Sequence, residues 1–216
     1  MKVKCKICGS DTRKIYHPRF AEYHYCNNCE FISRDEKHII SEQEELQIYN
    51  KHNNSIEDPR YVDFFYKFLN EAVFPYVKND KSGFDFGSGP SPVLAQILER
   101  NHKYQMDIYD LFYAPEKVYI GKKYDLITST EVIEHLRNPL ECFRLFVNLL
   151  NPEGVLAIMT LFHGNDETDF LNWHYIRDWS HISFYTPKTM AYIASQVGLK
   201  VIYTNNIRYT TFCLDR

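Results

Sequence analysis

The chain has 216 residues and a formal net charge of −3, which suits one domain of ordinary size with an appendage. No apolar run reaches the roughly 18 residues of a membrane span, and lysines interrupt the first apolar positions, which argues against a signal peptide. We therefore expect a cytoplasmic protein. The slightly acidic balance disfavours a nucleic-acid partner, and the sequence predicts nothing about the oligomeric state.

Two Cys-x-x-Cys pairs dominate residues 1–34. Cys5 and Cys8 form the first pair, Cys26 and Cys29 the second, and the 17 residues between the pairs are typical of a zinc ribbon. Two disulfides are the alternative, but the cytosol keeps thiols reduced. Because four protein thiolates leave no open coordination position, we predict a structural zinc ion in a ribbon with a structural or docking role.

Residues 35–79 are interpreted as a helical bridge or lid. Ser41 opens a capping-box pattern that predicts a helix to about Tyr49. Asp58 and the proline after it begin a second helix, whose apolar stripe favours packing against a sheet. The polar segment between the helices, 49–55, is either a linker or a flap over a cofactor.

The stretch from Gly83 to Pro92 has the pattern of a strand, a glycine turn and a helix start. Alternating phenylalanines favour a half-buried strand, and Gly87 and Gly89 let the backbone approach a ligand closely. Asp110 lies 23 residues after Gly87, at the end of a second strand-like run, where an acid can accept hydrogen bonds from ribose hydroxyls. The pattern predicts a nucleotide-cofactor loop.

Two features of this loop distinguish between cofactors. A dinucleotide fold prefers a third glycine under the pyrophosphate, and Pro92 holds that position here. Asp85 would repel a pyrophosphate but suits the ammonium group of an amino-acid ligand. S-adenosylmethionine (SAM) combines such a group with a ribose and an adenine, so the sequence predicts a SAM site. Its expected residues are Asp85, Gly87, Ser88, Gly89 and Asp110.

Strand and helix signals alternate in the expected core, residues 80–216. Strands are expected at 104–109, 124–129, 155–162, 199–203 and 209–214, and helices at 93–100, 139–150 and 187–197. This alternation predicts an α/β fold with a mostly parallel sheet and helices on both faces. Ligands bind such sheets at the carboxyl ends of the strands.

Two polar clusters are expected near that edge. If the segment 130–136 opens a helix, Glu131, Glu134 and His135 share one face and could act as acid/base groups or metal ligands. The alternative is an acidic helix start with the histidine bonded in the core. The long connection 173–187 contains further histidines and two tryptophans, and long ordered connections at this edge are typically functional.

Together these motifs resemble those of a class I SAM-dependent methyltransferase. More narrowly, the order zinc ribbon, Phe-Asp-Phe-Gly-Ser-Gly-Pro, Glu-Val-Ile-Glu-His-Leu and Asp-x-x-His-Ile-Ser-Phe-Tyr resembles a bacterial methyltransferase type 12/23 group over nearly the whole chain. The resemblance implies a Rossmann-like sheet of seven strands, although the third strand, near 117–119, is short. It also implies SAM contacts from Asp85, Gly87, Gly89 and Asp110, with Thr130 and Glu131 beside the cofactor.

The resemblance also limits the reaction. The Asn-Pro-Pro-Tyr motif of base amino methylation and the Pro-Cys nucleophile of pyrimidine C5 methylation are both missing from the sequence. We therefore expect an oxygen or carbon acceptor on a small molecule, with a sugar as one candidate. Methyl transfer needs an in-line approach and, for a poor nucleophile, a base. The expected catalytic residues are Glu131, Glu134, His135 and His181.

Two other functions stay open at this point. RNA 3′-terminal 2′-O-methyltransferases carry a similar Glu-x-x-Glu-His with a downstream histidine, there binding a divalent metal. A second metal ion, held by this cluster and His181, is therefore an alternative. The other possibility is a non-catalytic module in which the ribbon recruits a partner and the SAM fold is a relic. The intact set of SAM residues argues against this last function.

Overall fold

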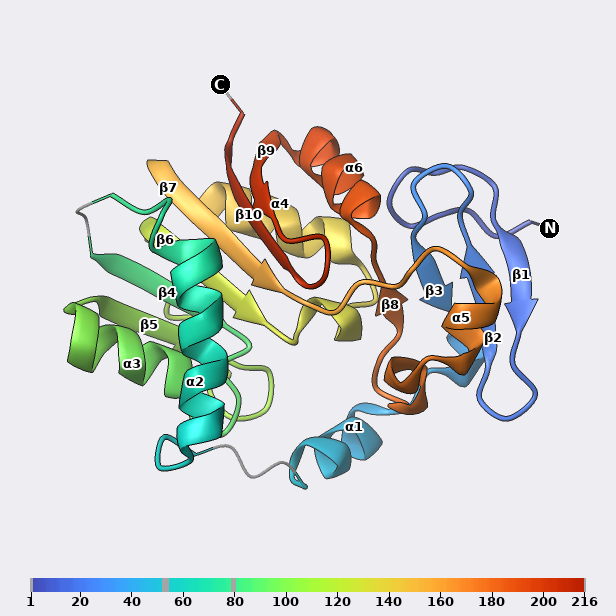
Figure 1. Ribbon diagram of the computed structural model, residues 1–216, viewed down its shortest axis with the longest axis horizontal. Helices are drawn as coiled ribbons and strands as arrows, with labels where there is room; N and C mark the ends of the chain where they lie inside the picture. Colours follow the sequence, from blue (N-terminus) through green and yellow to red (C-terminus); the bar gives the residue numbers. More distant parts are fainter. Residues whose placement is uncertain (1, 52–54, 79–80, 216) are drawn as a thin grey trace.

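A computed structural model describes residues 2–51, 55–78 and 81–215 (Figure 1). Its centre is a sheet in which six strands of the described chain follow the order β5-β4-β6-β7-β10-β9. The strands are β4 (Ser82–Phe86), β5 (Gln105–Tyr109), β6 (Tyr124–Thr130), β7 (Leu150–Met159), β9 (Leu199–Thr204) and β10 (Tyr209–Leu214). β10 is antiparallel to both of its neighbours, and the pairs among β4 to β7 are parallel. The predicted α/β sheet is confirmed.

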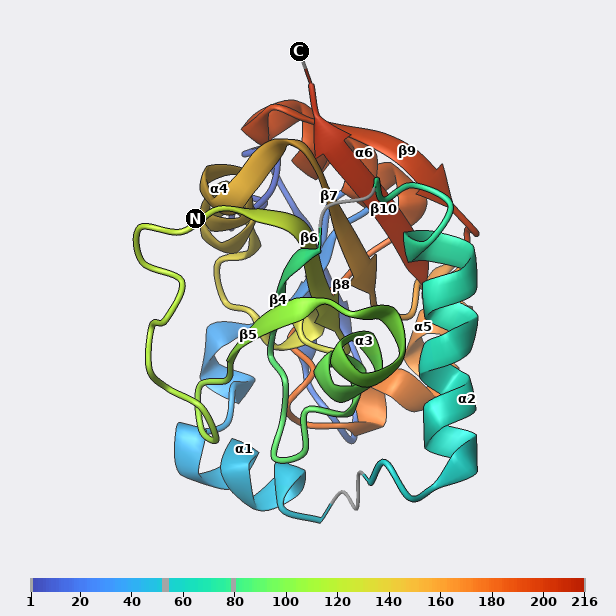
Figure 2. The same ribbon diagram turned by 90° about the vertical axis from the view of Figure 1, so that its left-hand side faces the viewer.

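Helices cover both faces of this sheet (Figures 1 and 2). One face carries α2 (Pro59–Phe68), its π-helical continuation η2 (Leu69–Val73) and α3 (Val93–His102), and the other carries α4 (Pro139–Leu149) and α6 (Pro187–Val197). None of the described helices is long and apolar enough to cross a membrane.

The strand β7 shows how the two faces are built. Side chains alternate between the two sides of a strand, so each strand of a covered sheet serves two cores. Val155, Ala157 and Met159 pack with residues of α2 and α3, whereas Leu156 and Ile158 pack with residues of α4 and α6. This near-continuous apolar run is typical of a strand buried on both faces.

The direction of strand addition reverses at β4. β5 lies on one side of β4, and β6, the next strand in the chain, lies on the other. The helices that follow β4 and β6, α3 and α4, cover opposite faces of the sheet, and open α/β sheets bind their ligands at the carboxyl ends of the strands at such a reversal. The glycine turn follows β4, and the segment 130–136 begins at the end of β6.

The described sheet has six strands rather than the expected seven. Between β5 and β6 the chain makes an isolated bridge from Asp110 to Ala114 and a turn at 118–121. Val118 and Ile120 in this segment are 37% and 73% exposed. Because these side chains do not bury an apolar face, little favours a further strand there, and β5 forms the edge of the sheet.

The helices before the sheet follow the predicted boundaries. After the short η1 (Glu36–His38), α1 (Glu42–Tyr49) begins at the Ser41 cap, and Ser41 and Glu44 form the expected capping box. Asp58 caps α2 through the Arg60 amide. α1 lies apart from both helix layers, at the lower edge of both views (Figures 1 and 2). The predicted flap at 49–55 includes residues 52–54, which lie outside the described residues.

The N-terminal ribbon shares a second sheet with the core. β1 (Arg13–Tyr16), β2 (Glu22–Tyr25) and β3 (Ile32–Arg34) are antiparallel, and β8 (Ser183–Phe184) pairs with β3 as a fourth strand. The connection before β8 contains α5 (Glu167–Asn172) and η4 (His174–Arg177) and packs on this sheet. Ribbon and core therefore meet through backbone pairing, and the boundaries at residues 34 and 79 stay predictions.

Arg34 fixes the backbone of this connection. Its side chain is 1% exposed, and Nη2 donates to the carbonyl oxygens of Ile176 and Asp178, both at 3.1 Å. The guanidinium carbon also lies 5.2 Å from the ring centre of Trp179. Burial lowers the pKa of Arg34, because a desolvated cation is costly, and the two carbonyls offset part of that cost.

We expect Arg34→Met to loosen the connection while sparing β4 and β5. Methionine has similar length but donates no hydrogen bond, so two carbonyls lose their partner at about 1–3 kcal/mol each. Hydrogen exchange should become faster at 174–182 and stay unchanged at 82–109. The exposed Arg144 on α4 provides the control, because Arg144→Met should change neither segment. Unaltered exchange at 174–182 in the Arg34 variant would contradict this role.

Candidate active site

A cavity of about 690 Å³ lies at the carboxyl ends of β4, β5 and β6. Its walls come from the loops after these strands, from α1 and α2, and from parts of the chain near residues 180 and 208. This volume lies within the range of small-molecule and cofactor sites, about 300–1,000 Å³. The structure brings most of the predicted site residues together here. They are Asp85, Gly87, Ser88, Gly89, Asp110, Thr130, Glu131, His135 and His181.

The glycine turn is shaped by two left-handed residues. Gly87 and Gly89 have φ values of +82° and +68°, which side chains rarely allow. A Cβ atom on Gly87 would lie 2.2 Å from Cγ2 of Val132, whereas one on Gly89 would meet no atom of the described chain within 4 Å. The amides of Gly87 and Ser88 donate to the Tyr109 carbonyl at 2.7 and 3.2 Å, which ties the turn to the end of β5.

Asp110 connects the glycine turn to the loop after β5 through hydrogen bonds from backbone amides. Its Oδ2 accepts a hydrogen bond from Gly89 N–H at 2.9 Å, and its Oδ1 accepts from Phe112 and Tyr113 N–H at 2.9 and 3.1 Å. A carboxylate offers about four acceptor positions, so these three bonds leave room for a further donor at Oδ2. Asp110, which the sequence predicts to bind the ribose, is therefore held in place by backbone amides before any ligand binds.

Asp85 is a buried carboxyl group at the floor of the cavity. It is 2% exposed, and its Oδ1 accepts a hydrogen bond from the Thr128 hydroxyl at 2.8 Å. Burial, with a smaller contribution from the Asp110 charge, raises the pKa of Asp85 to about 7. Nearby Tyr61 on α2 has its pKa raised to about 12 by burial and then by the charges of Asp85 and Glu131. A cationic ligand group beside Asp85 would favour the ionised form of this carboxyl group and lower its pKa again.

The segment after β6 differs from the helix that the sequence predicted. Thr130 ends the strand, Glu131 takes a left-handed φ of +53°, and only the single 3₁₀ turn η3 (Ile133–His135) follows. Glu131 therefore precedes the helical turn and does not share a face with the other two residues. Glu134 does not line the cavity. Its side chain is fully buried and accepts hydrogen bonds from the hydroxyls of Thr160, at 2.9 Å, and Tyr175.

Glu131 connects the cavity to this buried cluster. Its Oε2 lies 3.2 Å from the Tyr175 hydroxyl, while its Oε1 is buried without a hydrogen-bond partner among the described residues. Burial raises the pKa of Glu131, although Arg208 and Tyr175 counteract it. Burial and then the Glu131 charge raise the pKa of Glu134 as well. An orphaned buried oxygen at a cavity wall favours a polar ligand.

His135 and His181 lie side by side in the lining of the cavity, with ring centres 4.8 Å apart. Nδ1 of His135 lies 3.1 Å from the Ser180 carbonyl oxygen, and Nδ1 of His181 lies 2.9 Å from the Tyr175 carbonyl oxygen. A carbonyl oxygen only accepts, so Nδ1 carries the proton and Nε2 is the basic nitrogen of each neutral ring. Oδ2 of Asp178 lies 3.8 Å from Nε2 of His181.

A second metal ion at the cluster of Glu134 and the two histidines stays a prediction. Ligand atoms of Glu134, His135 and His181 lie within 4.8 Å of one another, and Glu131 is not part of this group. Both carboxylate oxygens of Glu134 are already bonded to hydroxyls, and each histidine presents Nδ1 to a carbonyl. A metal-bound histidine usually donates its other ring N–H to such an acceptor, so these bonds do not exclude a metal at Nε2. No metal-assisted step is derived from this cluster.

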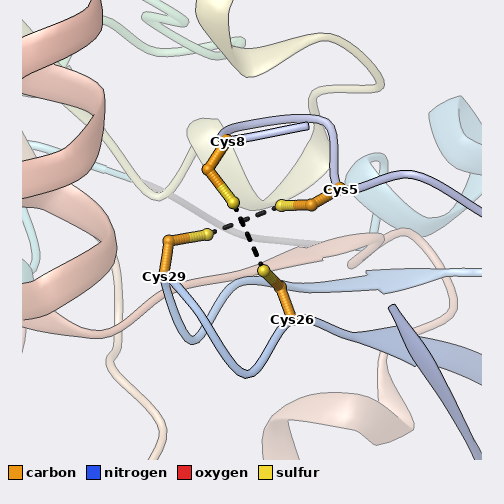
Figure 3. Close-up of side chains that lie close together, drawn as sticks. All are labelled: Cys5, Cys8, Cys26 and Cys29. Atoms are coloured by element: carbon orange, nitrogen blue, oxygen red, sulfur yellow. Dashed lines mark hydrogen bonds between the residues drawn. The ribbon is translucent and has the colours of Figure 1, made fainter. Parts of the chain in front are cut away.

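The four N-terminal cysteines converge on one point (Figure 3). Their sulfur atoms lie within 4.8 Å of one another, with 3.5 Å between Cys5 and Cys29 and 3.4 Å between Cys8 and Cys26. Tetrahedral zinc with bonds of about 2.3 Å would place sulfurs about 3.8 Å apart, close to these values. The cluster therefore fits the predicted zinc ribbon. Gly9, directly after the first pair, has the left-handed φ of +70° that its turn requires.

The second cysteine knuckle is held by the core. Its left-handed Glu30 accepts hydrogen bonds from Thr186 and Lys188 at 3.0 and 3.2 Å, and the Thr189 hydroxyl donates to the Cys29 carbonyl at 2.8 Å. Nε2 of His163 donates to the Glu30 carbonyl at 2.9 Å. Burial lowers the pKa of His163 to about 4, so this ring stays neutral and serves packing rather than chemistry.

Several cavity residues were not found from the sequence. Glu45 comes from α1, Tyr61 from α2, and Arg208 from the turn between β9 and β10, whereas Tyr49, also on α1, is the first residue of the predicted flap. Such residues carry no local motif, because only the tertiary fold brings α1, α2 and a distant turn to the ends of the strands. The apolar stripe that marked α2 as a core helix also contains Tyr61, and nothing in its spacing separated the two roles.

A methyltransferase domain model matches residues 59–204, which is more than half of the sequence. The chain belongs to this methyltransferase family. It is a member of the class I SAM-dependent methyltransferases, as its motifs and its mixed α/β sheet indicate. The match begins at α2, so the ribbon and α1 of this methyltransferase lie outside it.

Relatives of this methyltransferase include O-methyltransferases. Over 83 residues it is 32% identical to the ubiquinone biosynthesis O-methyltransferase of Glaesserella parasuis serovar 5 (strain SH0165), a match that covers 37% of this chain and only 35% of the relative. An O-methyltransferase family protein from Burkholderia thailandensis has a TM-score of 0.56 at 18% identity, with 73% of this chain and 60% of the other covered. Mitomycin 7-O-methyltransferase has a TM-score of 0.51 at 11% identity, covering 80% and 67%. These two structures show the fold alone.

The two glycines allow a matched test of the turn. Gly87→Ala adds a contact with Val132 to the left-handed strain, so we expect it to lower the unfolding free energy by about 2–5 kcal/mol. Gly89→Ala adds the strain alone, about 1–2 kcal/mol. Urea unfolding measures both, and Val132→Ala should recover part of the loss in Gly87→Ala but none in Gly89→Ala. Equal losses without recovery would refute the close approach of Val132.

Zinc should support more than the ribbon. Elemental analysis should find about one zinc per chain, and Cys26→Ser should remove it. Because the second knuckle contacts α6 and β3 pairs with β8, hydrogen exchange should then become faster at 22–34 and at 182–189. Exchange at 82–110 should not change. Cys213→Ser lies outside the cluster and should keep the zinc. A zinc-free Cys26 variant with full protection at 182–189 would show that docking does not need the metal.

Proposed function

We propose that this protein transfers a methyl group from SAM to an oxygen or carbon atom of a small-molecule acceptor. The observation that carries the proposal is one cavity in a methyltransferase-family chain that is lined by the glycine turn, by Asp110 and by two histidines. The names of the O-methyltransferase relatives support an oxygen acceptor first. A sugar hydroxyl is one candidate.

The cavity residues suit SAM at each of its polar groups. Asp110 would accept the ribose hydroxyls at Oδ2, because its other acceptor positions bind backbone amides. Gly87 and Gly89 let the ligand lie against the turn. Ser88 Oγ is buried without a partner in the described chain, so it offers a polar contact at the same place.

Asp85 and Arg208 provide the two charges that a methionine end requires. Both line the cavity, and Arg208 makes no ion pair within 4.0 Å among the described residues. Its guanidinium lies 5.6 Å from the ring centre of Phe64 on α2. The ammonium group would bind Asp85 and the carboxylate would bind Arg208, since a guanidinium matches a carboxylate with two hydrogen bonds.

The histidines supply a base at the acceptor end. Bound SAM supplies an electrophilic methyl group on a sulfonium sulfur. Nε2 of His135 or His181 accepts the proton of the acceptor hydroxyl as its oxygen takes the methyl group, a contribution of about 10² to 10⁴ in rate. The pKa of Asp178 is lowered: burial acts to raise it, but His181 and hydrogen bonds from Ser180 outweigh burial. Asp178 is therefore anionic and stabilises a protonated His181.

The carboxyl groups near the two histidines favour a small hydroxyl-bearing acceptor over RNA. Glu45, Asp178 and Glu131 place carboxyl groups on the cavity, and carboxylates repel a phosphate backbone while accepting hydrogen bonds from hydroxyls. Tyr49 of α1 packs against Phe112 and His135, with ring centres 5.7 and 5.2 Å apart, which narrows the opening on this side. The RNA methyltransferase and the non-catalytic module are therefore less well supported.

Asp85 predicts a pH dependence of SAM affinity. The pKa of this carboxyl group is about 7 in the folded protein, and an ammonium ligand needs its ionised form. Binding therefore releases a proton below that pH, and the affinity should fall about tenfold for each pH unit below about 7 and level off above it. Calorimetry from about pH 5 to about pH 8 measures this. Asp85→Asn should bind SAM weakly at every pH, and an unchanged profile in that variant would remove Asp85 from the site.

The function is tested by following label from methyl-labelled SAM. Label should enter a small-molecule extract and not an RNA fraction. With the acceptor that this identifies, His135→Ala or His181→Ala should lower turnover by about 10² or more and leave SAM affinity within a few-fold. The exposed His174 is the matched control, and His174→Ala should be as active as the wild type. Labelled RNA, or normal turnover in both cavity variants, would refute the proposal.

A further inference from the structure

A second cavity, of about 500 Å³, lies between the turn that joins β1 to β2 and the connection that contains α5 and η4. Arg19 and Phe20 line it from the ribbon, and Asn172 and Arg177 line it from the connection. None of these residues takes part in the methyl-transfer cavity. The chain links the two sites closely, however, because Arg177 lines the second cavity and Asp178 lines the first.

The charge of this cavity is positive. Its lining contains two guanidinium groups and no carboxylate, and neither Arg19 nor Arg177 lies within 4.0 Å of a carboxylate in the described parts of the chain. The neighbouring Arg13, in contrast, pairs with Glu167 of α5. Two cations that line one cavity repel each other, and an anion bound between them would attract both and offset that repulsion.

His17, a further polar residue of the lining, also offers a hydrogen-bond donor. Nδ1 of His17 accepts a hydrogen bond from the Arg19 amide at 3.1 Å, so the proton of the neutral ring is on Nε2. The ring of Phe20 lies 4.5 Å from that of His17 and 6.0 Å from that of Trp179, and Arg34 lies under Trp179. These ring contacts hold His17 and Phe20, whereas Arg19 and Arg177 are exposed side chains that line the cavity.

We infer that this second cavity binds the phosphate group of a small phosphorylated molecule. A carboxylate has two oxygens and satisfies one guanidinium in a bidentate pair, whereas a phosphate has enough oxygens to bind Arg19, Arg177 and His17 together. The site is independent of the SAM residues and of the acceptor histidines. Its ligand would lie behind the segment that carries Asp178 and His181 to the methyl-transfer cavity.

Calorimetric titration of the full chain with inorganic phosphate, at constant ionic strength, tests the inference. We expect saturable binding of one phosphate per chain, and a loss of about tenfold or more in affinity for Arg19→Gln and for Arg177→Gln. The exposed Arg144 on α4 is the matched control, and Arg144→Gln should bind phosphate like the wild type. Acetate at the same concentration should bind much more weakly.

Three results would overturn it. They are no saturable phosphate binding, equal phosphate affinity in the Arg19, Arg177 and Arg144 variants, and tighter binding of an RNA oligonucleotide than of phosphate through the same two arginines. Thermal unfolding of each variant checks that the exposed substitutions leave the fold intact. Because the readout is phosphate binding, failure of the methyl-transfer proposal would leave this test unaffected.

Discussion

The pairing of β4 with β5 on one side and with β6 on the other determines where this protein can bind a ligand. It brings the end of β5 beside the glycine turn, and Val132 of the segment after β6 lies against Gly87. Asp110 joins the glycine turn to the loop after β5, because its carboxylate accepts hydrogen bonds from the amide of Gly89 and from the amides of Phe112 and Tyr113. A cofactor site made this way is rigid before ligand arrives, so binding need not order it.

The part of the cavity lined by Asp178 and His181 depends on contacts with the ribbon. β8 pairs with β3, Arg34 holds the carbonyls at 176 and 178, and the second cysteine knuckle is bonded to α6. Asp178 and His181 belong to the segment that these contacts fix. The ribbon with its cysteine cluster thus supports the part of the cavity that carries Asp178 and His181, while the sheet supports the part that carries the glycine turn and Asp110. This division explains why a small ribbon and a methyltransferase core form one structure.

Local signals accounted for most of the fold. Capping residues placed α1 and α2, the glycine pattern placed the turn after β4, and cysteine spacing identified the four-cysteine cluster, because each of these features is decided within a few residues. The sequence failed where backbone conformation depends on distant packing. Glu131 took a left-handed φ, so the expected helix does not begin there. The side chain of Glu134 is directed to Tyr175 in the core. Arg208 and the pairing of β3 with β8 were invisible for the same reason, since they join segments far apart in the chain.

A crystal structure with S-adenosylhomocysteine tests the central claim most directly. We predict ribose oxygens within about 3.2 Å of Asp110 Oδ2, the amino group beside Asp85, and the sulfur atom directed toward the wall formed by His135 and His181. Binding outside this cavity would contradict the account. So would a sulfur atom directed away from both histidines, beyond the reach of a hydrogen bond or one bridging water from an acceptor placed next to it.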